Sequence, residues 1–254
     1  KILVLGAGFY YVNILKQLRE GGFYVLSVDI NPEAIGKNFS DIFSCIDIKD
    51  KISVLDFAVK NKIDGIMPIN DFGTRTAAFV SRKMGLIGIS EKCSECANDK
   101  GLMREVWKKK KLIIPNFEVI SNISQIEEFT LQYGFPVVLK PTDCGGSGRG
   151  ISVISNKKEI KWAYQFAYPF VKNGRFIIEE FIDGVEMTVE TISINEKVYI
   201  LTTSDKIKAN LKTRVATSLN FPSFFSKNII KKVEKLVTDA VLSLGIKNGM
   251  AHTE

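Results

Sequence analysis

The most informative part of the chain is Val137-Val138-Leu139-Lys140-Pro141-Thr142-Asp143-Cys144-Gly145-Gly146-Ser147-Gly148-Arg149-Gly150. An apolar run ends at Lys140 and Pro141, a glycine-rich segment follows, and residues 151–154 resume the apolar run. This order predicts a strand, a loop and a second strand. Glycines let a backbone take positive φ and approach a ligand closely, and successive N–H groups in such a loop form an anion-binding concavity. With the charge of Lys140 beside it, the loop predicts a polyphosphate ligand.

The glycine-rich loop matches neither of the common phosphate motifs. A P-loop places a lysine and a Ser or Thr after its glycines and continues into a helix. A protein-kinase loop also has its lysine after the glycines, whereas Lys140 precedes them here. A plain glycine-rich hairpin with an ordinary surface lysine therefore stays open as an alternative.

Composition describes an ordinary globular protein. Of its 254 residues, 45% are hydrophobic and 25% are charged, which is typical of globular domains. No apolar run approaches the roughly 18–20 residues of a membrane span, so we expect no membrane partner. The start of the chain, Ile2–Leu5, resembles a buried strand and not a signal peptide. We expect a cytoplasmic protein.

The net charge of +7 raises the question of nucleic-acid binding. The densest basic run, Lys108-Lys109-Lys110-Lys111, follows a segment that can be helical, and lysines near a helix C-terminus suit the helix dipole. No interleaving of aromatic and basic residues of the RNA-recognition type occurs in the sequence. We interpret the run as a solvated helix face and expect no nucleic-acid partner.

The number and spacing of the cysteines and the histidine limit the kinds of metal and catalytic site that the sequence can form. Cys93 and Cys96 form a Cys-x-x-Cys among four cysteines, but no second pair accompanies them, and His252 is the sole histidine. A structural zinc site and a Ser-His-Asp triad are therefore disfavoured. Reduced cysteines suit the cytosol.

Residues 1 to about 90 alternate between strand-like and helix-like patterns. Alternation of this kind predicts a parallel sheet covered on both faces. The Gly6-Ala7-Gly8 turn, with Asp29 after the second strand, resembles a dinucleotide-binding turn, but the third glycine of that fingerprint falls at Tyr11. NAD binding is thus the weaker interpretation. The predicted strands cover residues 2–5, 24–28 and 65–68, and the predicted helices cover residues 11–20, 52–61 and 74–84.

The remaining residues mix helices and strands with loops. Ser124 and Glu127 have the spacing of a capping box, which predicts a helix starting there. Residues 205–222 resemble a loop that lines a substrate site. Helices are predicted over residues 99–107, 124–133, 157–166 and 229–244, and strands over residues 175–182, 186–194, 197–202 and 249–254.

Four segments in this order resemble the ATP-grasp superfamily of carboxylate–amine or carboxylate–thiol ligases. They are Asn98-Asp99-Lys100 with Met103-Arg104, the Lys140 strand with its glycine loop, Glu179-Glu180-Phe181-Ile182-Asp183-Gly184-Val185-Glu186, and Gly249-Met250-Ala251-His252-Thr253-Glu254. Each motif is loose alone, but their joint order and spacing make the resemblance specific. It spans essentially the whole chain.

The resemblance implies an α/β fold in which a Rossmann-like parallel sheet precedes α+β ATP-grasp subdomains. Residues 1–95 would form the pre-ATP-grasp domain and residues 96–254 the ATP-grasp domain. The smaller lobe would cover residues 115–182, and the C-terminal lobe would start near residue 183. The family's second metal site, a Glu-x-Asn pair on a following strand, is not in the sequence, so we expect incomplete Mg²⁺ coordination and no turnover by this chain alone.

The resemblance also implies site residues for ATP and Mg²⁺, with Mn²⁺ as a substitute. Lys100 and Lys140 would contact phosphates under the loop that holds Gly145, Gly146, Ser147 and Gly148. Glu179 would accept a hydrogen bond from the adenine amino group, the segment Glu180, Phe181 and Ile182 would face the adenine edge, and Glu186 would hold the ribose. Glu254 would bind metal. Lys206, Lys212 and Arg214 could bind phosphate or substrate carboxylate. Each of these charged side chains could instead be a solvated surface group.

The leading hypothesis is an ATP-dependent ligase that acts on a small-molecule carboxylate and an amine. A nucleotide-binding module without ligase turnover is the alternative, and an NAD-dependent enzyme or a nucleic-acid binder ranks lower. The sequence leaves both substrates undefined, and it leaves a homodimer open.

Overall fold

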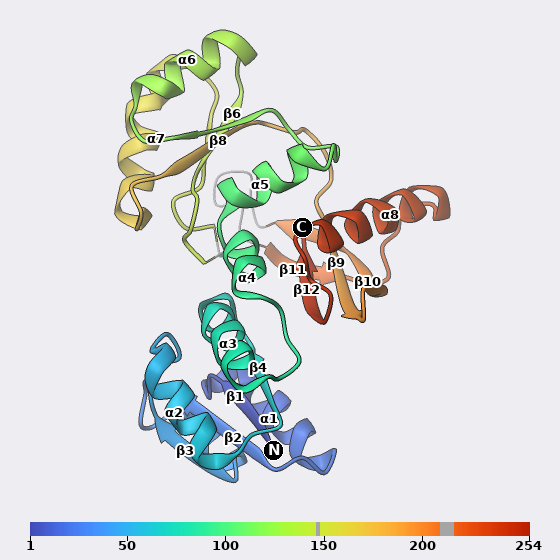
Figure 1. Ribbon diagram of the computed structural model, residues 1–254. Helices are drawn as coiled ribbons and strands as arrows, with labels where there is room; N and C mark the ends of the chain where they lie inside the picture. The colour runs from blue at the N-terminus through green and yellow to red at the C-terminus, as the bar shows by residue number, and fades with distance from the viewer. Residues whose placement is uncertain (146–147, 209–215) are drawn as a thin grey trace. The chain divides into compact units, whose positions relative to one another are not determined.

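The computed structural model describes residues 1–145, 148–208 and 216–254 (Figure 1). The chain divides into two compact units, Lys1–Glu95 and Cys96–Glu254. Within the described ranges, no helix combines the length and the apolar character needed to cross a membrane.

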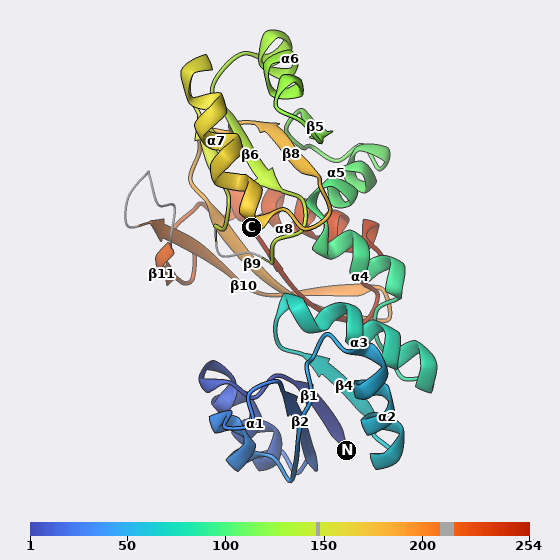
Figure 2. The same ribbon diagram turned by 90° about the vertical axis from the view of Figure 1, so that its left-hand side faces the viewer.

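The first unit is built on a parallel sheet with the strand order β3-β2-β1-β4. Side chains alternate between its two faces, so each face needs its own cover. Leu3 and Leu5 pack against α2 and α3 on one face, whereas Val4 packs against α1 on the other (Figure 2). The predicted parallel sheet covered on both faces is confirmed. The elements are β1 (Ile2–Leu5), η1 (Phe9–Tyr11), α1 (Val12–Glu20), β2 (Val25–Asp29), η2 (Ile35–Phe39), β3 (Ile42–Cys45), α2 (Lys51–Asn61), β4 (Gly65–Pro68) and α3 (Asp71–Met84).

The turn that follows β1 is stabilised by a side chain of the neighbouring strand β2. Gly6 takes a φ of 121°, which favours glycine, and the Asp29 carboxylate accepts hydrogen bonds from Ala7 N at 2.8 Å and Asn31 N at 2.9 Å. The ring of Tyr11 lies against Gly6. Asp29 therefore has a structural role at the turn that resembled a dinucleotide fingerprint.

The second unit contains two antiparallel sheets. The first has the order β5-β8-β6-β7 and is flanked by three helices. The segment from β6 through the glycine-rich loop to β7 confirms the predicted strand, loop and strand. The elements are α4 (Glu91–Asn98), in which the unit boundary falls, α5 (Lys100–Lys109), β5 (Phe117–Ile120), α6 (Ser124–Tyr133), β6 (Val137–Pro141), β7 (Ser152–Ile154), η3 (Lys157–Glu159), α7 (Ile160–Ala167), η4 (Tyr168–Phe170) and β8 (Phe176–Glu180).

The core of this sheet forms on one face, under α6 and α7. Val137 and Leu139 of β6 point into this core with Phe176 and Ile178 of β8. Because strand side chains alternate, the intervening residues of both strands point to the opposite face. That opposite face is the one beside α5, which packs against β5 and β8.

The second sheet has the order β11-β10-β9-β12, and α8 packs against β10. Its elements are β9 (Met187–Ile194), β10 (Lys197–Lys208), β11 (Ala216–Asn220), α8 (Lys227–Ser243) and β12 (Gly249–Thr253). The prediction that residues 205–222 form a loop is wrong at both ends. β10 continues to Lys208, and β11 pairs with it antiparallel. Exposed polar residues on β11 hid the strand pattern.

The predicted capping box of α6 is also wrong, although the helix covers the predicted residues. The Ser124 hydroxyl donates to Asn122 Oδ1 at 2.7 Å. Asn122 Oδ1 accepts from Gln125 N at 3.3 Å, and the Gln125 side chain accepts from Ser121 N at 2.9 Å. The cap is built two residues earlier than predicted, by Asn122 with Gln125. Taken together, the fold is α/β, with a parallel N-terminal sheet followed by α+β layers, as predicted.

Candidate functional site

The carboxylate of Glu179 lies between two cations on the α5 side of the first sheet of the second unit. β6 and β8 are antiparallel neighbours, with Lys140 opposite Ile177 and Glu179 opposite Val138. Glu179 forms ion pairs with Lys140 of β6 and with Arg104 of α5. The Arg104 Nε lies 2.5 Å from Glu179 Oε1. The Glu179 side chain is 3% exposed, and each cation is 21% exposed. We call Arg104, Lys140 and Glu179 the buried triad.

The charge state of Glu179 follows from its two partners. Burial alone would raise the pKa of this carboxyl, but the charges of Lys140 and Arg104 outweigh burial and lower its pKa below the usual value. Glu179 is therefore ionised at neutral pH. The alternative that Glu179 is a surface charge on an edge strand is wrong, because β8 lies between β5 and β6.

Lys100 lies close in the fold to the end of β6. Its backbone N–H donates to Thr142 O at 2.8 Å, so the first residue of α5 is bonded to a residue two positions after Lys140. The Asp99 side chain caps the helix by accepting from Leu102 N at 2.9 Å. The N-terminus of a helix carries partial positive charge and attracts anions. The structure thus gathers a helix start, Lys100 and Lys140 at one end of β6.

The glycine-rich loop starts from this same end of β6. Gly145, Gly148 and Gly150 take φ values of 67°, 71° and 66°, in the region that favours glycine. A Cβ at Gly150 would lie 3.0 Å from both Pro141 and the Phe170 ring, so this position also lacks room for a side chain. Gly146 and Ser147, two predicted site residues, lie outside the described residues.

Glu180 ends β8, and residues 181–186 connect β8 to β9. Glu180 N donates to Asn116 O at 3.0 Å, and the Glu180 carboxylate accepts from Asn116 N at 2.9 Å. Phe181 N donates to Pro136 O at 3.2 Å, whereas Ile182 is 66% exposed. The predicted adenine-edge segment therefore starts at the end of the buried strand and runs into solvent.

A second charged group lies on one face of the β9–β10–β12 sheet. Lys206 Nζ contacts Glu186 at 2.6 Å and also pairs with Glu254. His252 lies opposite Glu190 in the strand register, and its Nδ1 is 2.5 Å from Glu190 Oε1. His252 Nε2 is 3.8 Å from Glu254 Oε1. We call these five residues the open cluster, because Glu254 and His252 are about half exposed.

Mutual contacts shift the pKa values in the open cluster. The contact with His252, opposed by burial and reinforced by Lys206, lowers the pKa of Glu254 to about 2. The Glu254 and Glu190 carboxylates raise the pKa of His252 to about 9. Burial would lower the pKa of Lys206, but Glu186 and Glu254 outweigh it and raise that pKa above its usual value. Glu254, His252 and Lys206 can thus be charged together near neutral pH.

The open cluster contains the predicted metal ligand Glu254. A carboxylate is a suitable Mg²⁺ ligand, and Mg²⁺ is often held by one or two carboxylates plus substrate phosphates. Among the described residues, no group of three or more His, Cys, Asp or Glu side chains is arranged to hold a metal ion. The residues present fit a metal that depends on phosphate oxygens for most of its ligands.

The remaining predicted residues are two basic side chains. Lys212 and Arg214 lie outside the described residues. Asp205, next to Lys206, is buried and accepts hydrogen bonds from Ser223 Oγ at 2.7 Å and Phe224 N at 2.9 Å. This carboxylate fixes the chain after β11 and leaves Lys206 on the other face of β10.

Arg104, Glu190 and His252 received no site role from the sequence. Arg104 follows Lys100 by four residues, so helical spacing places the two on one side of α5 and could have indicated it. Glu190 follows Glu186 at a spacing that puts both on one face of an extended chain. For the Arg104–Glu179 pair itself, 75 residues apart, the sequence holds no local signal.

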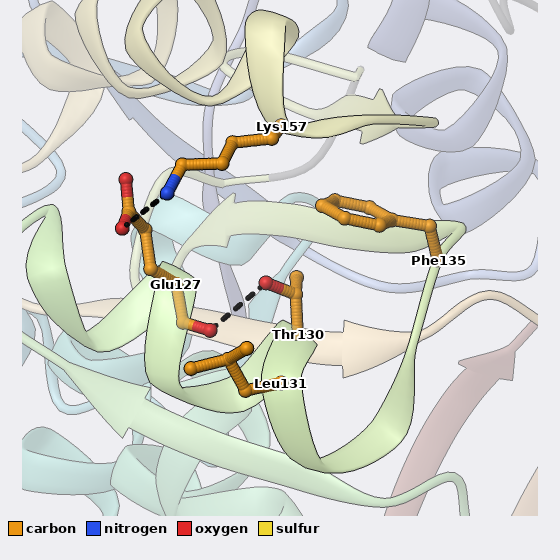
Figure 3. A pocket seen from close by; sticks show the side chains of 5 residues that line it. All are labelled: Glu127, Thr130, Leu131, Phe135 and Lys157. Atoms are coloured by element: carbon orange, nitrogen blue, oxygen red, sulfur yellow. Dashed lines mark hydrogen bonds and ion pairs between the residues drawn. The ribbon is translucent and has the colours of Figure 1, made fainter.

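A small hollow lies elsewhere in the second unit, on the outer side of α6. It is lined by Glu127, Thr130, Leu131, Phe135 and Lys157 (Figure 3). Lys157 pairs with Glu127 across it at 3.1 Å, and Thr130 Oγ1 donates to Glu127 O at 3.0 Å. The hollow shares no residue with the buried triad or the open cluster.

Two antiparallel sheets, with a glycine-rich segment between β6 and β7, form the architecture of the ATP-grasp class. The family model described as ATP-grasp domain matches residues 105–252, more than half of the chain. The chain belongs to the ATP-grasp family.

Curated relatives resemble nearly the whole chain. The carbamoyl phosphate synthase large chain of Pseudothermotoga lettingae is 26% identical over 97% of this chain and 24% of its own length. The large chain from Clostridium botulinum is 25% identical over 100% of this chain and 25% of its own length. This chain therefore spans about a quarter of the length of these relatives.

Solved structures share the fold at low identity. Phosphoribosylglycinamide synthetase from Anaerococcus prevotii gives a TM-score of 0.77 at 23% identity, over 99% of this chain and 63% of that one. N5-carboxyaminoimidazole synthetase from Staphylococcus aureus, complexed with ADP, gives 0.83 at 14% identity, over 99% and 65%. The biotin carboxylase domain dimer of Hydrogenobacter thermophilus 2-oxoglutarate carboxylase, in complex with MgADP, ADP and bicarbonate, gives 0.83 at 19% identity, over 99% and 60%.

Proposed function

We propose that this chain is the ATP-binding part of a ligase that activates a substrate carboxylate as an acyl phosphate for attack by an amine. The observation that carries the proposal is the gathering of Lys100, Lys140 and the start of α5 at the end of β6, where the glycine-rich loop begins. Family membership and a neighbour complexed with ADP support it. In this assignment residues 1–95 form the pre-ATP-grasp domain and residues 96–254 the ATP-grasp domain, with lobes at 115–182 and from 183.

Each group has a role that its chemistry suits. The two lysines and the loop residues Gly145, Gly146, Ser147 and Gly148 would hold phosphates, since cations and backbone N–H groups offset phosphate charge. Ionised Glu179 would accept from the adenine amino group beside the segment Glu180, Phe181 and Ile182. Glu186 would accept from the ribose hydroxyls, because a carboxylate has two acceptor oxygens.

Glu254 would bind Mg²⁺, or Mn²⁺ in its place, together with phosphate oxygens of ATP. The ion would neutralise charge that develops on the phosphates during transfer. In the structure Lys206 pairs with Glu254 and Glu186. Lys206, with Lys212 and Arg214, would then be available for phosphate or the substrate carboxylate.

The proposed reaction has two steps. A carboxylate oxygen forms a bond to the γ-phosphorus while the bond from that phosphorus to the β-γ bridging oxygen breaks, which releases ADP. The amine nitrogen then bonds to the acyl carbon, the bond from that carbon to the phosphate oxygen breaks, and phosphate leaves as the nitrogen loses a proton. Phosphoryl transfer depends mainly on positioning and charge stabilisation. The side chains of the site supply those two functions without a nucleophilic Cys or Ser.

ADP and phosphate release would be measured with Mg²⁺-ATP against a panel of carboxylates and amines, with hydroxylamine added to trap an acyl phosphate as a hydroxamate. The proposal expects a hydroxamate that requires both ATP and one carboxylate, and phosphate release that rises further with an amine. Nucleotide binding without any substrate-dependent product would favour the alternative of a nucleotide-binding module.

We also propose that the protein is cytoplasmic and that it can form a homodimer. Cys45, Cys93, Cys96 and Cys144 all lie in described parts of the chain and are free thiols, which suits a reducing compartment. Light scattering after gel filtration would give a mass near twice 28.4 kDa for a dimer.

A further inference from the structure

Glu179 has two counterions, and the proposed function requires one of them, Lys140, to contact ATP instead. In the structure the Glu179 carboxylate pairs with both Lys140 and Arg104. When ATP binds, Lys140 is required at the phosphates. An ionised carboxylate that is 3% exposed cannot replace a lost counterion with bulk water. Its remaining partner therefore determines whether Lys140 can leave at low cost.

Arg104 is built to stay in place. Its guanidinium carbon lies 5.1 Å from the centroid of the Trp107 ring, one turn along α5. Trp107 in turn donates from Nε1 to Ala240 O of α8 at 3.1 Å. Arginine presents a planar fork that stacks on aromatic rings, whereas lysine is a point charge on a flexible stem. The fixed cation is thus Arg104, and the movable one is Lys140.

We infer that Arg104 is a positioning residue that holds Glu179 ionised and in place while Lys140 transfers from Glu179 to the phosphates of ATP. This inference rests on the proposed nucleotide site. The charged groups that face Glu179 are Arg104 from α5 and Lys140 from β6, and its register partner on β5 is Phe117. Without Arg104, nucleotide binding would leave Glu179 unpaired in a buried position, or force it to take up a proton.

Calorimetric titration of ATP into the purified protein tests the inference with Arg104→Gln, Glu179→Gln and the double variant. Arg104→Gln is expected to raise the Kd for ATP by more than about 100-fold at pH 8, the size associated with stranding a buried charge. In the Glu179→Gln background no buried carboxylate is left without a counterion. The same arginine substitution there should change Kd by less than about 3-fold.

A second readout separates this role from a purely structural one. In Arg104→Gln, ATP binding should take up close to one proton, measured from titrations in buffers of different ionisation enthalpy. The Kd of this variant should then fall relative to that of the wild type as pH falls from 8 to 6. Lys109→Gln, which removes an exposed charge from the same helix, is the matched control and should match the wild type in both readouts.

The outcomes are distinct from those of the proposed function. A wild-type protein that does not bind ATP would refute the nucleotide site itself. The inference alone is overturned if the wild type binds ATP and Arg104→Gln binds equally tightly. It is also overturned if the arginine substitution costs as much in the Glu179→Gln background as in the wild-type background. Where Arg104→Gln is poorly folded, the comparison of Glu179→Gln with the double variant still tests the inference, and a change in Kd well above about 3-fold between those two overturns it.

Discussion

The buried triad and the open cluster are opposite solutions to placing charge in one unit. The triad surrounds one carboxylate with two cations, which gives a net charge of +1, and Glu179 is almost wholly buried. The open cluster sets Lys206 and protonated His252 among Glu186, Glu190 and Glu254, which gives a net charge of −1 in a half-exposed setting. The first composition suits a phosphate, and the second suits a metal cation.

The difference in burial teaches which contacts matter for stability. Removing one partner of a buried pair strands the other charge, whereas exposed pairs are screened and contribute little. In the triad, both cations depend on one carboxylate. In the open cluster, each cation has two carboxylates, so loss of Glu254 leaves Lys206 with Glu186 and His252 with Glu190.

The largest expected effect comes from Glu179 of the buried triad, with Glu254 of the open cluster as its counterpart for comparison. Glu179→Ala is expected to lower the free energy of unfolding by about 3 kcal/mol, because two partly buried cations lose their counterion. Glu254→Ala should cost less than about 1 kcal/mol. Trp107 and Trp162, the two tryptophans, both belong to the second unit, so their fluorescence during urea unfolding reports on that unit alone. Equal losses in the two variants would erase the distinction between the clusters.

Lys140→Met should separate ligand binding from stability within the triad. Met keeps the apolar stem, and Arg104 still pairs with Glu179, so the free energy of unfolding should fall by only about 1 kcal/mol. The Kd for ATP should rise about 10- to 100-fold, since a charge-assisted contact to phosphate is lost. Titration calorimetry and urea unfolding measure the two quantities. A variant that loses stability but not ATP affinity would assign Lys140 a structural role instead.

Trp107→Phe should have a smaller effect. The phenyl ring can still stack under Arg104, but the hydrogen bond from Nε1 to Ala240 O is lost, for a net cost of about 1 kcal/mol. Fluorescence of the remaining Trp162 follows unfolding in urea. Trp162→Phe is the matched control, because Trp162 is 58% exposed, and it should cost clearly less. A larger loss at Trp162 would contradict the importance of the contact between α5 and α8.

The smallest expected effect is a pH dependence from the open cluster. Folding raises the pKa of His252 from a usual value of 6.5 to about 9, so its contribution is full below pH 6.5 and is lost as pH rises through 9. Half of the side chain is exposed, so screening should keep the change below about 1 kcal/mol. Urea midpoints between pH 6 and pH 10 measure it. His252→Gln should remove this component of the slope, and an unchanged slope would assign it to other groups.

The sequence predicted well what local pattern determines. The boundaries of β1, β4 and α6 were predicted to the residue, and the glycine-rich loop was placed between the correct strands. These elements have apolar spacing or turn residues that act over a few neighbours. The short edge strands β3 and β5 were not predicted, because an edge strand of four residues shows little alternation.

The charged residues show more clearly what a local sequence pattern cannot predict. Lys140 and Glu179 were predicted as separate ATP contacts, but their pairing joins strands β6 and β8 through tertiary structure. Arg104 lies on a helix 75 residues before its partner Glu179. No local pattern records such a contact, because the energy that selects it arises only when the groups leave water together. The predicted roles of Lys100, Glu186 and Lys206 toward ATP and substrate remain predictions.

The hydrogen bond from Lys100 N to Thr142 O is made between backbones, and this has a consequence for protein engineering. Side-chain replacement at either position leaves the donor and acceptor in place, provided that the new residue is not proline at position 100. The start of α5 and the end of β6 thus form a site of fixed backbone geometry, which we call the socket. The charge of the side chain at position 100 in this socket can be changed. A set of substitutions at position 100, from Arg through Gln to Glu, would vary the charge at constant main-chain geometry and could retune which anions the socket accepts.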